Sequence, residues 1–458
     1  MVRDGRNKSG HGESMSTEPS PLLTDLYQLN MIQAYLDHGD TGTAVFELFC
    51  RTLPARRGFL MAAGLAQALD YLENLRFSED DIAWLRGTGR FKTNALDYFA
   101  QMRFTGDVHA MPEGTVFFAN EPILRVTAPL PQAQLVETRL INILHFQSLV
   151  AAKAARCMLA APGKVLVDFG LRRAHGAEAG VMAARASYVA GFAGTATVLA
   201  GELFGIPLYG TMAHSFIEAF DDETAAFETY ARSRPNNLVF LLDTYDTEAA
   251  ARKVVALAPR LKADGIIVRA VRLDSGDLIA LSKSVRAILD HGGLRDVTIF
   301  VSGGLDEDSL QAFAKAEAPI DGIGIGTSLT TSADVPNVDF VYKMQEYAGL
   351  PRRKKSDKKA TWPGRKQVWR RFAGDVMSGD VLALESSRQD GEPLLAPVMQ
   401  NGKRIAPSPP LDDVRRHAKR ELERLPEPLR RLDSGTTYPV AVADALRTLA
   451  AEVDRRMA

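Results

Sequence analysis

The sequence predicts an α/β protein whose middle part forms a parallel α/β barrel, with an N-terminal α+β domain before it and a charged, helical extension after it. In the middle part, strand-like apolar runs alternate with helical patterns such as Thr247–Ala263 and Leu278–Asp290. Most of these runs are rich in β-branched residues, as expected of parallel strands buried on both faces. A closed or nearly closed barrel is expected, and an open doubly wound sheet is the alternative. The expected strands are Lys164–Phe169, Ile206–Gly210, Leu238–Asp243, Gly265–Val271, Thr298–Val301 and Gly322–Ile325.

Changes of pattern along the chain predict its domain organisation. The first 19 residues have no apolar segment, so we expect a disordered tail rather than a signal peptide. A long helix is predicted from Leu135 to Leu159, where the regular strand–helix period begins. The predicted parts are the tail at 1–19, an α+β domain at 20–134 that part of 343–400 completes, the catalytic barrel at 135–342, a basic loop with strands at 343–400, and a helical segment at 401–458.

The two flanking regions show mixed patterns and no catalytic signature of their own. In the N-terminal region, apolar residues at helical spacing begin at Leu26, and other segments alternate as strands do. The predicted strands there are Ala44–Cys50 and short pieces around Gly106–Ala110 and Thr115–Phe118, and a second helix covers Ala62–Leu75. In the C-terminal region, helices are predicted at Asp412–Leu425 and Val440–Ala458.

Composition limits the classes of function. A chain of 458 residues favours two or three domains, and its net charge of −1 provides no global field for nucleic acid or an anionic membrane. The two cysteines, Cys50 and Cys157, lie in apolar surroundings, which favours buried thiols over a disulfide or a metal site. No apolar run reaches transmembrane length, so we expect a cytoplasmic protein with neither a membrane nor a nucleic-acid partner.

One basic segment departs from this balance. Arg352–Arg371 holds ten Lys or Arg residues and one acid, Asp357. Such runs are usually solvated faces or nucleic-acid patches. Because the balancing acids lie elsewhere in the chain, a localised positive lobe is predicted.

Polar residues follow the predicted barrel strands. Asp168, Phe169 and Arg172 follow the first strand, and Thr211 and His214 follow the second. Active-site groups of parallel α/β folds lie where strands end, so the two clusters are expected to form one site, with ordinary strand ends as the alternative. The histidine has no second histidine at zinc-binding spacing, so a zinc site is not predicted.

A third strand end carries Arg272, Asp274, Ser275 and Asp277. These polar groups are costly to bury without partners. Arg272 is expected to bind an anionic substrate through paired hydrogen bonds. Asp274 would then face a ribose hydroxyl or a developing cation. The alternative is helix capping by Ser275 or Asp277.

Two further strand ends are rich in glycine, which allows close backbone approach to an anion. Phosphate held by the loops after the last two strands recurs in α/β barrels. Neither loop matches the Walker or dinucleotide pattern, so a nucleotide fold is not indicated. The expected phosphate-binding residues are Ser302, Gly303, Gly304, Gly324, Gly326 and Thr327.

Taken together, the motifs resemble those of the nicotinate phosphoribosyltransferase family, in the right order from Thr24-Asp-Leu-Tyr-Gln to about Arg371. The basic segment from Lys355 to Gln367 also matches the basic loop of that family. The other motifs are Asp168-Phe-Gly-Leu-Arg-Arg, Gly210-Thr-Met-Ala-His-Ser, Arg272-Leu-Asp-Ser-Gly-Asp, Ser302-Gly-Gly-Leu and Gly324-Ile-Gly-Thr.

The resemblance implies an irregular α/β barrel of the type II phosphoribosyltransferases and a homodimer with shared active sites. It implies that nicotinate and phosphoribosyl pyrophosphate give nicotinate mononucleotide and pyrophosphate in NAD salvage, coupled to ATP hydrolysis. Mg²⁺ is expected to accompany the two phosphorylated substrates, with ligands unknown. The resemblance implies that His214 is a phosphohistidine and that Asp274 and Arg172 are further catalytic groups. It implies that nicotinate is held by Phe169, Thr211 and Arg272, together with Tyr27 from the partner subunit. The glycine loops would hold the 5-phosphate.

A nicotinamide phosphoribosyltransferase is the runner-up. The resemblance extends to the nicotinamide enzymes around Phe192-Ala-Gly-Thr-Ala-Thr, but those enzymes carry an acid at the position of Ala196. A carboxylate there would repel nicotinate, so its absence favours the acid substrate. Quinolinate phosphoribosyltransferase shares the implied fold, yet the residues around His214 resemble the salvage branch.

Overall fold

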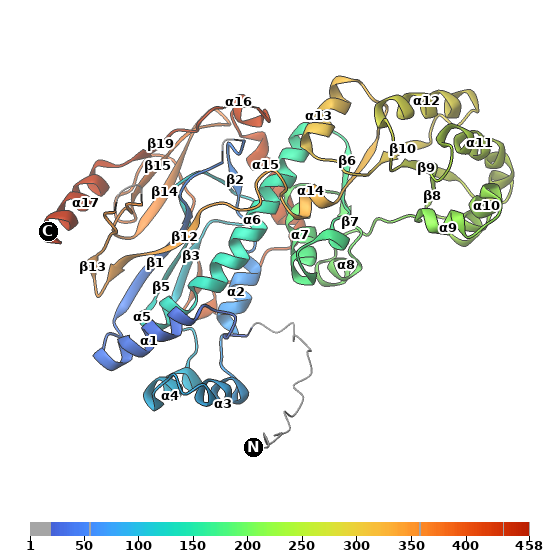
Figure 1. The fold of residues 1–458 in the computed structure, drawn as a ribbon. Helices are drawn as coiled ribbons and strands as arrows, with labels where there is room; N and C mark the ends of the chain where they lie inside the picture. The colour runs from blue at the N-terminus through green and yellow to red at the C-terminus, as the bar shows by residue number, and fades with distance from the viewer. Residues whose placement is uncertain (1–19, 55, 357–358, 434, 458) are drawn as a thin grey trace, which may run out of the picture.

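The computed structural model describes residues 20–54, 56–356, 359–433 and 435–457, and the predicted tail at 1–19 lies outside these ranges. The chain forms two lobes, and helix α6 (Glu137–Ala160) runs between them (Figure 1). Each lobe has its own large sheet, and of the two large apolar cores the one beneath the barrel sheet extends into the other lobe, where it includes Met61, Phe118 and Val414. The predicted helix at Leu135–Leu159 is therefore present, although a shorter helix, α5 (Leu130–Leu135), precedes it. Cys50 and Cys157 are free and buried.

One lobe contains a parallel sheet of six strands in the order β7-β6-β11-β10-β9-β8. From β8 to β11 and from β6 to β7, successive strands are added in the same direction, and β11 pairs with β6, which is the winding of a barrel rather than of a doubly wound sheet. Leu208 extends the β7 edge by a single bridge to Thr195, and no pairing joins Leu208 to β8 in the described residues. The barrel is therefore open, and irregular, at this place. The strands are β6 (Val165–Asp168), β7 (Gly194–Thr195), β8 (Leu238–Leu241), β9 (Val268–Leu273), β10 (Thr298–Val301) and β11 (Gly322–Ile325).

The predicted strand at Ile206–Gly210 is wrong in extent, because only Leu208 pairs. Pro207 has no N–H to donate, which interrupts a ladder at that point. The short strand β7, which was not predicted, is possible because Gly194 lies against this segment. A Cβ atom at Gly194 would lie 2.2 Å from the carbonyl oxygen of Pro207.

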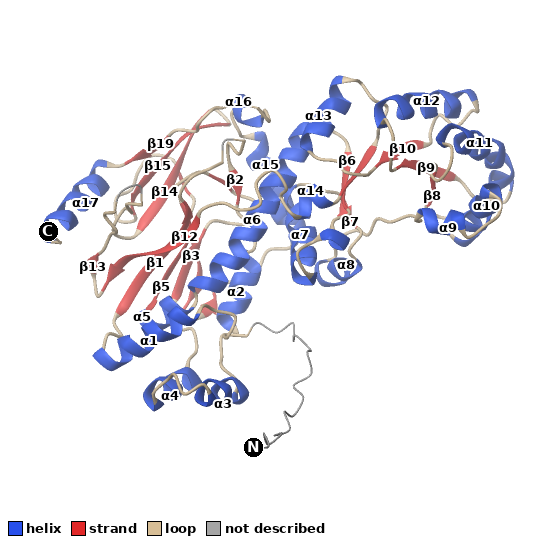
Figure 2. Cartoon of the chain, in the orientation of Figure 1, coloured by secondary structure: helices blue, strands red, loops and turns tan. Residues whose placement is uncertain are grey.

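Helices cover the parallel sheet and fix where each loop after a strand ends (Figure 2). Four of them begin with an aspartate whose carboxylate accepts backbone N–H bonds, namely Asp222, Asp246, Asp277 and Asp306. Capping thus accounts for Asp277, whereas Ser275 donates to Asp243 instead. The covering helices are α7 (Ala177–Ala190), α8 (Val198–Phe204), α9 (His214–Glu218), α10 (Glu223–Ser233), α11 (Thr247–Ala263), α12 (Leu278–His291), α13 (Glu307–Lys315) and α14 (Thr327–Thr330).

The other lobe is built on an antiparallel sheet in the order β13-β12-β1-β5-β3-β17-β18. Segments from before and after the barrel therefore share one sheet, and β12 pairs directly with β1. The strands are β1 (Thr43–Cys50), β3 (Asp107–Ala110), β5 (Pro122–Pro129), β12 (Phe340–Tyr347), β13 (Leu350–Pro351), β17 (Ala396–Gln400) and β18 (Lys403–Arg404). Around them lie α1 (Leu26–His38), α2 (Leu65–Glu73), α3 (Glu79–Gly87), α4 (Thr93–Gln101) and the pair β2 (Leu60–Met61) and β4 (Val116–Phe117).

The C-terminal region contains both helices and strands. Its predicted helix at Val440–Ala458 begins with a strand, β19, which pairs with β15 in a sheet of order β16-β14-β15-β19. Val440 and Val442 are β-branched, and the strand environment outweighs the helical charge pattern there. The elements are β14 (Lys366–Ala373), β15 (Val376–Leu384), β16 (Glu392–Pro393), β19 (Val440–Val442), α15 (Leu411–Glu423), α16 (Glu427–Arg430) and α17 (Asp444–Arg456).

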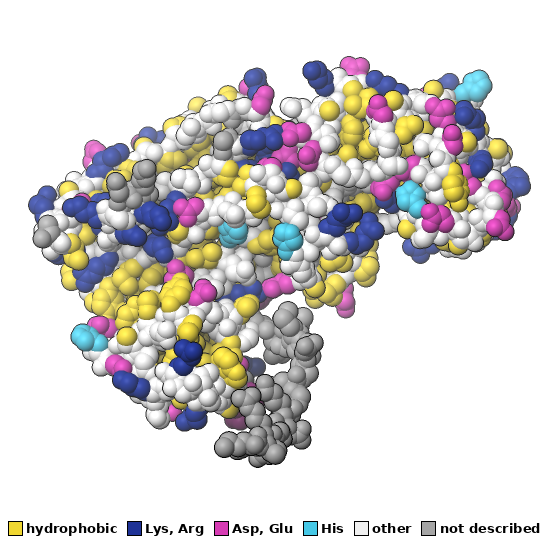
Figure 3. All heavy atoms as spheres, viewed as in Figure 1, with side chains coloured by type: hydrophobic (Ala, Val, Ile, Leu, Met, Phe, Trp, Pro, Cys, Tyr) yellow, Lys and Arg dark blue, Asp and Glu magenta, His cyan; other side chains and the backbone are white. Residues whose placement is uncertain are grey.

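The basic segment is not a uniform positive lobe. Lys366 is buried against Glu47, with 2.8 Å between nitrogen and oxygen, and Arg370 is buried against Asp380 at 2.7 Å. The prediction missed this because both acids lie outside the basic segment: Glu47 is on β1, far away in the chain, and Asp380 faces Arg370 only once β15 pairs with β14. Lys354, Lys355 and Lys359, which follow β13 in the chain, are exposed. Figure 3 shows a group of Lys and Arg side chains on the face of this lobe.

Arg370 lies in a buried cluster with the acids Glu121, Asp380 and Glu421. Burial, and then the charge of Asp380, raise the pKa of Glu121 well above its usual value. At pH values between the ordinary pKa of a glutamate and this raised pKa, the folded protein holds a proton on Glu121 that the unfolded chain releases. This group stabilises the fold fully at low pH, and its contribution is lost as the pH rises through the raised pKa.

We expect Glu121→Gln to remove this pH dependence, because the amide keeps the shape of the protonated acid without titrating. Relative to the wild type, the variant should gain up to about 1.4 kcal/mol of unfolding free energy per pH unit above the ordinary glutamate range. Melting temperatures from pH 5 to 9 measure the effect, and Glu79→Gln on the exposed start of α3 is the control. Parallel curves for wild type and Glu121→Gln would contradict the assignment.

Candidate active site

Arg272 is the centre of a polar cluster at the carboxyl end of β9. Its Nε donates to Ser302 Oγ at 2.8 Å and its Nη2 to Asp274 Oδ1 at 2.6 Å. Its Nη1 makes only long contacts, at 3.2 Å to Thr211 Oγ1 and 3.4 Å to the Met212 carbonyl oxygen. Two edges of the guanidinium are therefore held firmly, and the Nη1 edge is the one that a bound anion can most easily take over.

Asp274 connects this arginine to the histidine. Burial alone would raise the pKa of Asp274, but hydrogen bonds from Ser302 and Arg272, together with the charge of Arg272, hold it below its usual value. The carboxylate is thus ionised at neutral pH, and its Oδ2 lies 4.0 Å from Nε2 of His214. The other ring nitrogen, Nδ1, lies 3.1 Å from Thr244 Oγ1. The imidazole is oriented at Nδ1, and its side chain is 38% exposed, so Nε2 is accessible.

Phe169 forms the apolar wall of the cluster. The guanidinium carbon of Arg272 lies 5.5 Å from the centroid of its ring. The ring packs over Gly324, where a Cβ atom would come within 2.4 Å of a ring carbon, so the position requires glycine. The preceding residue, Asp168, is buried and accepts bonds from Gly170 N at 2.8 Å and Thr195 Oγ1 at 2.7 Å. Burial raises the pKa of Asp168 to about 6.

The two glycine loops lie next to this wall. Gly303 has φ +99°, and a Cβ atom there would lie 2.0 Å from the carbonyl oxygen of Asp274, so only glycine fits. Gly304, with φ +66°, faces open space. Gly326 and the exposed Thr327 begin α14 after the neighbouring strand. Adjacent backbone amides at two strand ends can hold a phosphate group.

Two predicted residues stand apart from the cluster. Tyr27 lies on α1 in the other lobe, is 47% exposed, and has its pKa raised to about 12 by burial of part of the ring and by the charge of Glu137. Arg172 is exposed in the short helix η1 (Leu171–Arg173), just after Phe169. Within the described part of the chain, its guanidinium forms no hydrogen bond or ion pair with the cluster.

Sequence analysis missed Asp243 and Thr244, which follow β8 at the same edge of the sheet. Thr244 contacts His214, and Asp243 accepts a bond from Ser275. The available signal was their place directly after a predicted strand, which is the position that singled out the other site residues.

The described residues contain no group of three or more His, Cys, Asp or Glu side chains placed to hold a metal ion. Within the described ranges, the helices are all too short or too polar to cross a bilayer.

An α/β barrel that places an arginine, an ionised aspartate and a histidine beside two glycine loops, at the carboxyl ends of its strands, has the arrangement of a barrel enzyme suited to anionic, phosphorylated ligands. Comparison with known proteins identifies the family. Models of the N-terminal domain, the central region and the C-terminal domain of nicotinate phosphoribosyltransferase match residues 22–145, 165–358 and 386–450. The chain belongs to the nicotinate phosphoribosyltransferase family.

Individual relatives agree with this assignment. A nicotinate phosphoribosyltransferase of Mycobacterium tuberculosis is 51% identical over 93% of this chain and 92% of its own length. The Bacillus subtilis enzyme of the same name is 36% identical over 92% of this chain and 93% of its own length. The crystal structure of human nicotinic acid phosphoribosyltransferase superposes with a TM-score of 0.84, at 30% identity, over 94% of this chain and 99% of that one. The predicted fold class is confirmed.

Proposed function

We propose that the protein transfers the phosphoribosyl group of phosphoribosyl pyrophosphate to nicotinate, forming nicotinate mononucleotide and pyrophosphate for NAD salvage. The observation that carries the proposal is the convergence of Arg272, His214 and the Gly303–Gly304 turn at one edge of the barrel. Family membership supports the same reaction.

The nicotinate carboxylate would bind the Nη1 edge of Arg272 together with Thr211, and the pyridine ring would lie against Phe169. An aromatic pair of this kind adds about 0.5–1.5 kcal/mol beyond burial. Ala196 follows β7 beside Asp168, and its backbone N–H donates to the Asp168 carbonyl oxygen at 2.8 Å. Because the alanine adds no negative charge at this strand end, the acid substrate is favoured over nicotinamide.

Ribosyl transfer builds positive charge on the sugar while pyrophosphate leaves, so positioning and charge stabilisation dominate the barrier. Asp274 is ionised and lies beside the expected position of the sugar, where its charge would stabilise the developing cation. The loops at Gly303–Gly304 and Gly326–Thr327 would hold the 5-phosphate through backbone amides. Arg172, exposed at the rim, would contact the leaving pyrophosphate.

ATP would phosphorylate His214 at Nε2. Thr244 Oγ1 would accept a hydrogen bond from Nδ1–H in the tautomer whose Nε2 lone pair is free, so that Nε2 would attack the γ-phosphorus of ATP and ADP would leave. Mg²⁺ would enter with the phosphorylated substrates, since it binds proteins through one or two carboxylates plus phosphate oxygens. The ends of β8 and β9 fit this chemistry: Asp243 has a buried oxygen, Oδ1, with no hydrogen-bond partner among the described residues, and Asp274 lies at the end of the neighbouring strand. Bound Mg²⁺ would neutralise phosphate charge.

A homodimer would bring Tyr27 of one subunit to the nicotinate pocket of the other. Exposed apolar side chains support this. On α1 and before it, Leu23, Leu26 and Tyr27 are 52%, 45% and 47% exposed, and near the pocket α8 presents Val198 and Leu203 at 70% and 56%. Unpaired apolar patches of this kind mark interaction surfaces.

We expect Leu203→Glu to convert the dimer to monomers and to reduce transferase activity with it, because a charge would be buried in the contact and the partner's Tyr27 would be lost. Light scattering after gel filtration measures the mass, and Val376→Glu on the distant β14–β15 hairpin is the control. A Leu203→Glu protein that still has twice the chain mass would rule out α8 as the contact.

The decisive test of the proposed function offers equal nicotinate and nicotinamide to the purified protein with phosphoribosyl pyrophosphate, Mg²⁺ and ATP. Mass spectrometry of the products should show nicotinate mononucleotide and little of the amide. Preferential formation of nicotinamide mononucleotide would establish the runner-up instead.

A further inference from the structure

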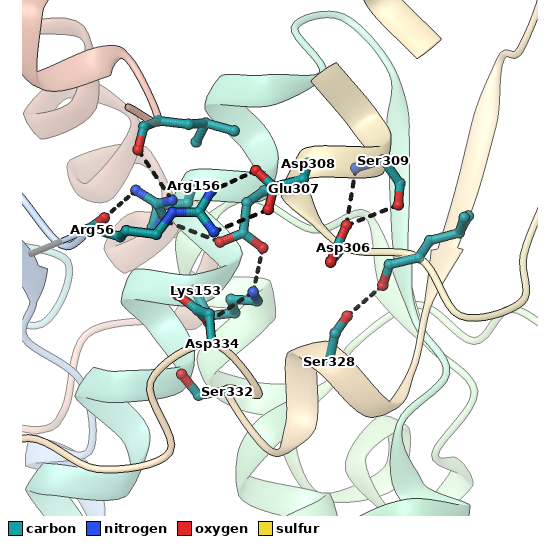
Figure 4. Close-up of polar contacts among 12 residues, drawn as sticks. Arg56, Lys153, Arg156, Asp306, Glu307, Asp308, Ser309, Ser328, Ser332 and Asp334 are labelled. Atoms are coloured by element: carbon teal, nitrogen blue, oxygen red, sulfur yellow. Dashed lines mark hydrogen bonds and ion pairs between the residues drawn. The ribbon is translucent and has the colours of Figure 1, made fainter. Parts of the chain in front are cut away.

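A buried network of ion pairs joins helix α6 to the segments that follow the two glycine loops (Figure 4). Lys153 Nζ on α6 lies 2.8 Å from Asp334 Oδ1 and contacts Glu307 Oε2 as well. Arg156, one turn further along α6, donates to Glu307 Oε1 at 3.1 Å. Arg57 approaches from the other lobe and lies 2.8 Å from Asp334. Lys153, Arg57 and Glu307 are each only 1% exposed.

The two acids of this network follow the two phosphate loops in the sequence. Glu307 is the first residue of α13, which starts three positions after Gly304. Asp334 follows α14, which starts directly after Gly326. The hydroxyl of Ser328 on α14 also donates to the carbonyl oxygen of Leu305, so the two loops are tied to each other. Lys153 therefore connects one rigid helix to both loops through a single ammonium group.

Charge and burial indicate more than stabilisation. With the adjoining pair Arg56–Asp308 included, four cations (Lys153, Arg156, Arg57 and Arg56) face three acids (Glu307, Asp334 and Asp308), which leaves one positive charge in excess among the described residues. The Arg57 Nη1 atom is buried and has no hydrogen-bond partner within the part of the chain that the structure describes. Buried ion pairs often contribute little net stability, because desolvation offsets their attraction. Their fixed geometry, and a surplus positive charge near two anion-binding loops, are useful for holding a phosphorylated ligand.

We propose that Lys153 is a positioning residue that sets the spacing of the two phosphate loops for the sugar donor; this rests on the proposed function. Lys153 touches no substrate and acts through Glu307 and Asp334. Removing its ammonium group takes away the one cation that contacts both acids, and leaves Arg156 to hold Glu307 and Arg57 to hold Asp334 separately. Small displacements of binding groups weaken catalysis strongly, so Lys153→Met should raise the KM for phosphoribosyl pyrophosphate by about tenfold or more. The KM for nicotinate should stay within about twofold.

The test measures both KM values together with hydrogen exchange of the peptides that contain 302–307 and 326–332. Faster exchange is expected in both peptides of Lys153→Met. Lys153→Arg should restore slow exchange and most of the donor affinity, because it retains the charge. Arg185→Met, which breaks the buried pair of Arg185 with Glu113 at 2.7 Å, is the matched control and should lower the melting temperature without changing the donor KM.

The outcomes separate the two proposals. If the wild type forms no nicotinate mononucleotide, the proposed function fails, and the positioning role is then judged by hydrogen exchange and by calorimetric titration with phosphoribosyl pyrophosphate. Two results with an active wild type would overturn the positioning role. The first is that Lys153→Met raises the KM for phosphoribosyl pyrophosphate no more than Arg185→Met does. The second is that hydrogen exchange in the two loop peptides of Lys153→Met is the same as in the wild type.

Discussion

Arg272→Ala is expected to raise the KM for nicotinate by roughly 10- to 150-fold. A hydrogen bond to a charged partner contributes about 1.5–3 kcal/mol, and each 1.4 kcal/mol corresponds to a factor of about ten. The structure locates this loss at Nη1, whose present contacts at 3.2 and 3.4 Å are the longest that the guanidinium makes. The KM for phosphoribosyl pyrophosphate should change far less.

Two further variants make this result specific. Arg272→Lys keeps the charge but cannot bond to Ser302, Asp274 and a carboxylate at once, so its nicotinate KM should fall between those of wild type and Arg272→Ala. Arg269→Ala removes an exposed arginine from the same strand and should behave as wild type. A nicotinate KM unchanged in Arg272→Ala would remove this arginine from the base pocket.

His214→Ala is expected to abolish the stimulation of the reaction by ATP while slow, ATP-independent transfer continues. The imidazole supplies the Nε2 atom that accepts phosphate, and alanine offers no nucleophile. The measurements are initial rates with and without ATP, and mass spectrometry of the ATP-treated protein for one acid-labile phosphate. Thr244→Val, which removes the oxygen 3.1 Å from Nδ1, should slow phosphorylation without eliminating it.

The control for this experiment is His291→Ala, because His291 is exposed at the end of α12, outside the site. It should retain both the phosphate and the ATP response. An equal ATP response in wild type and His214→Ala would contradict the phosphohistidine role, and a phosphate retained in His214→Ala would move it to another residue.

Much of the barrel could be predicted because its signals are local. A run of β-branched residues followed by a polar residue and a glycine marks a strand and its end, whatever the rest of the chain does. Arg272, Asp274, Thr211 and His214 were identified by that rule and lie in contact. Thr244 follows the same rule and was overlooked. The strand at Leu208 was overestimated, since apolar composition does not reveal that Pro207 interrupts pairing.

By itself the sequence determined which residues end the strands, where glycine is required, and which chemical groups are available for an anion and a pyridine acid. Only the tertiary structure decided how distant segments meet. Strand β12, which follows the barrel in the sequence, pairs with β1, which precedes it, and Lys153 contacts Glu307, which is 154 positions further along the chain. Periodicity and propensity act over a few residues, whereas partners of buried charges and sheet edges are chosen by the packing of the complete fold. The basic segment shows the difference, because its composition indicated a positive lobe and its folded surroundings neutralise Lys366 and Arg370.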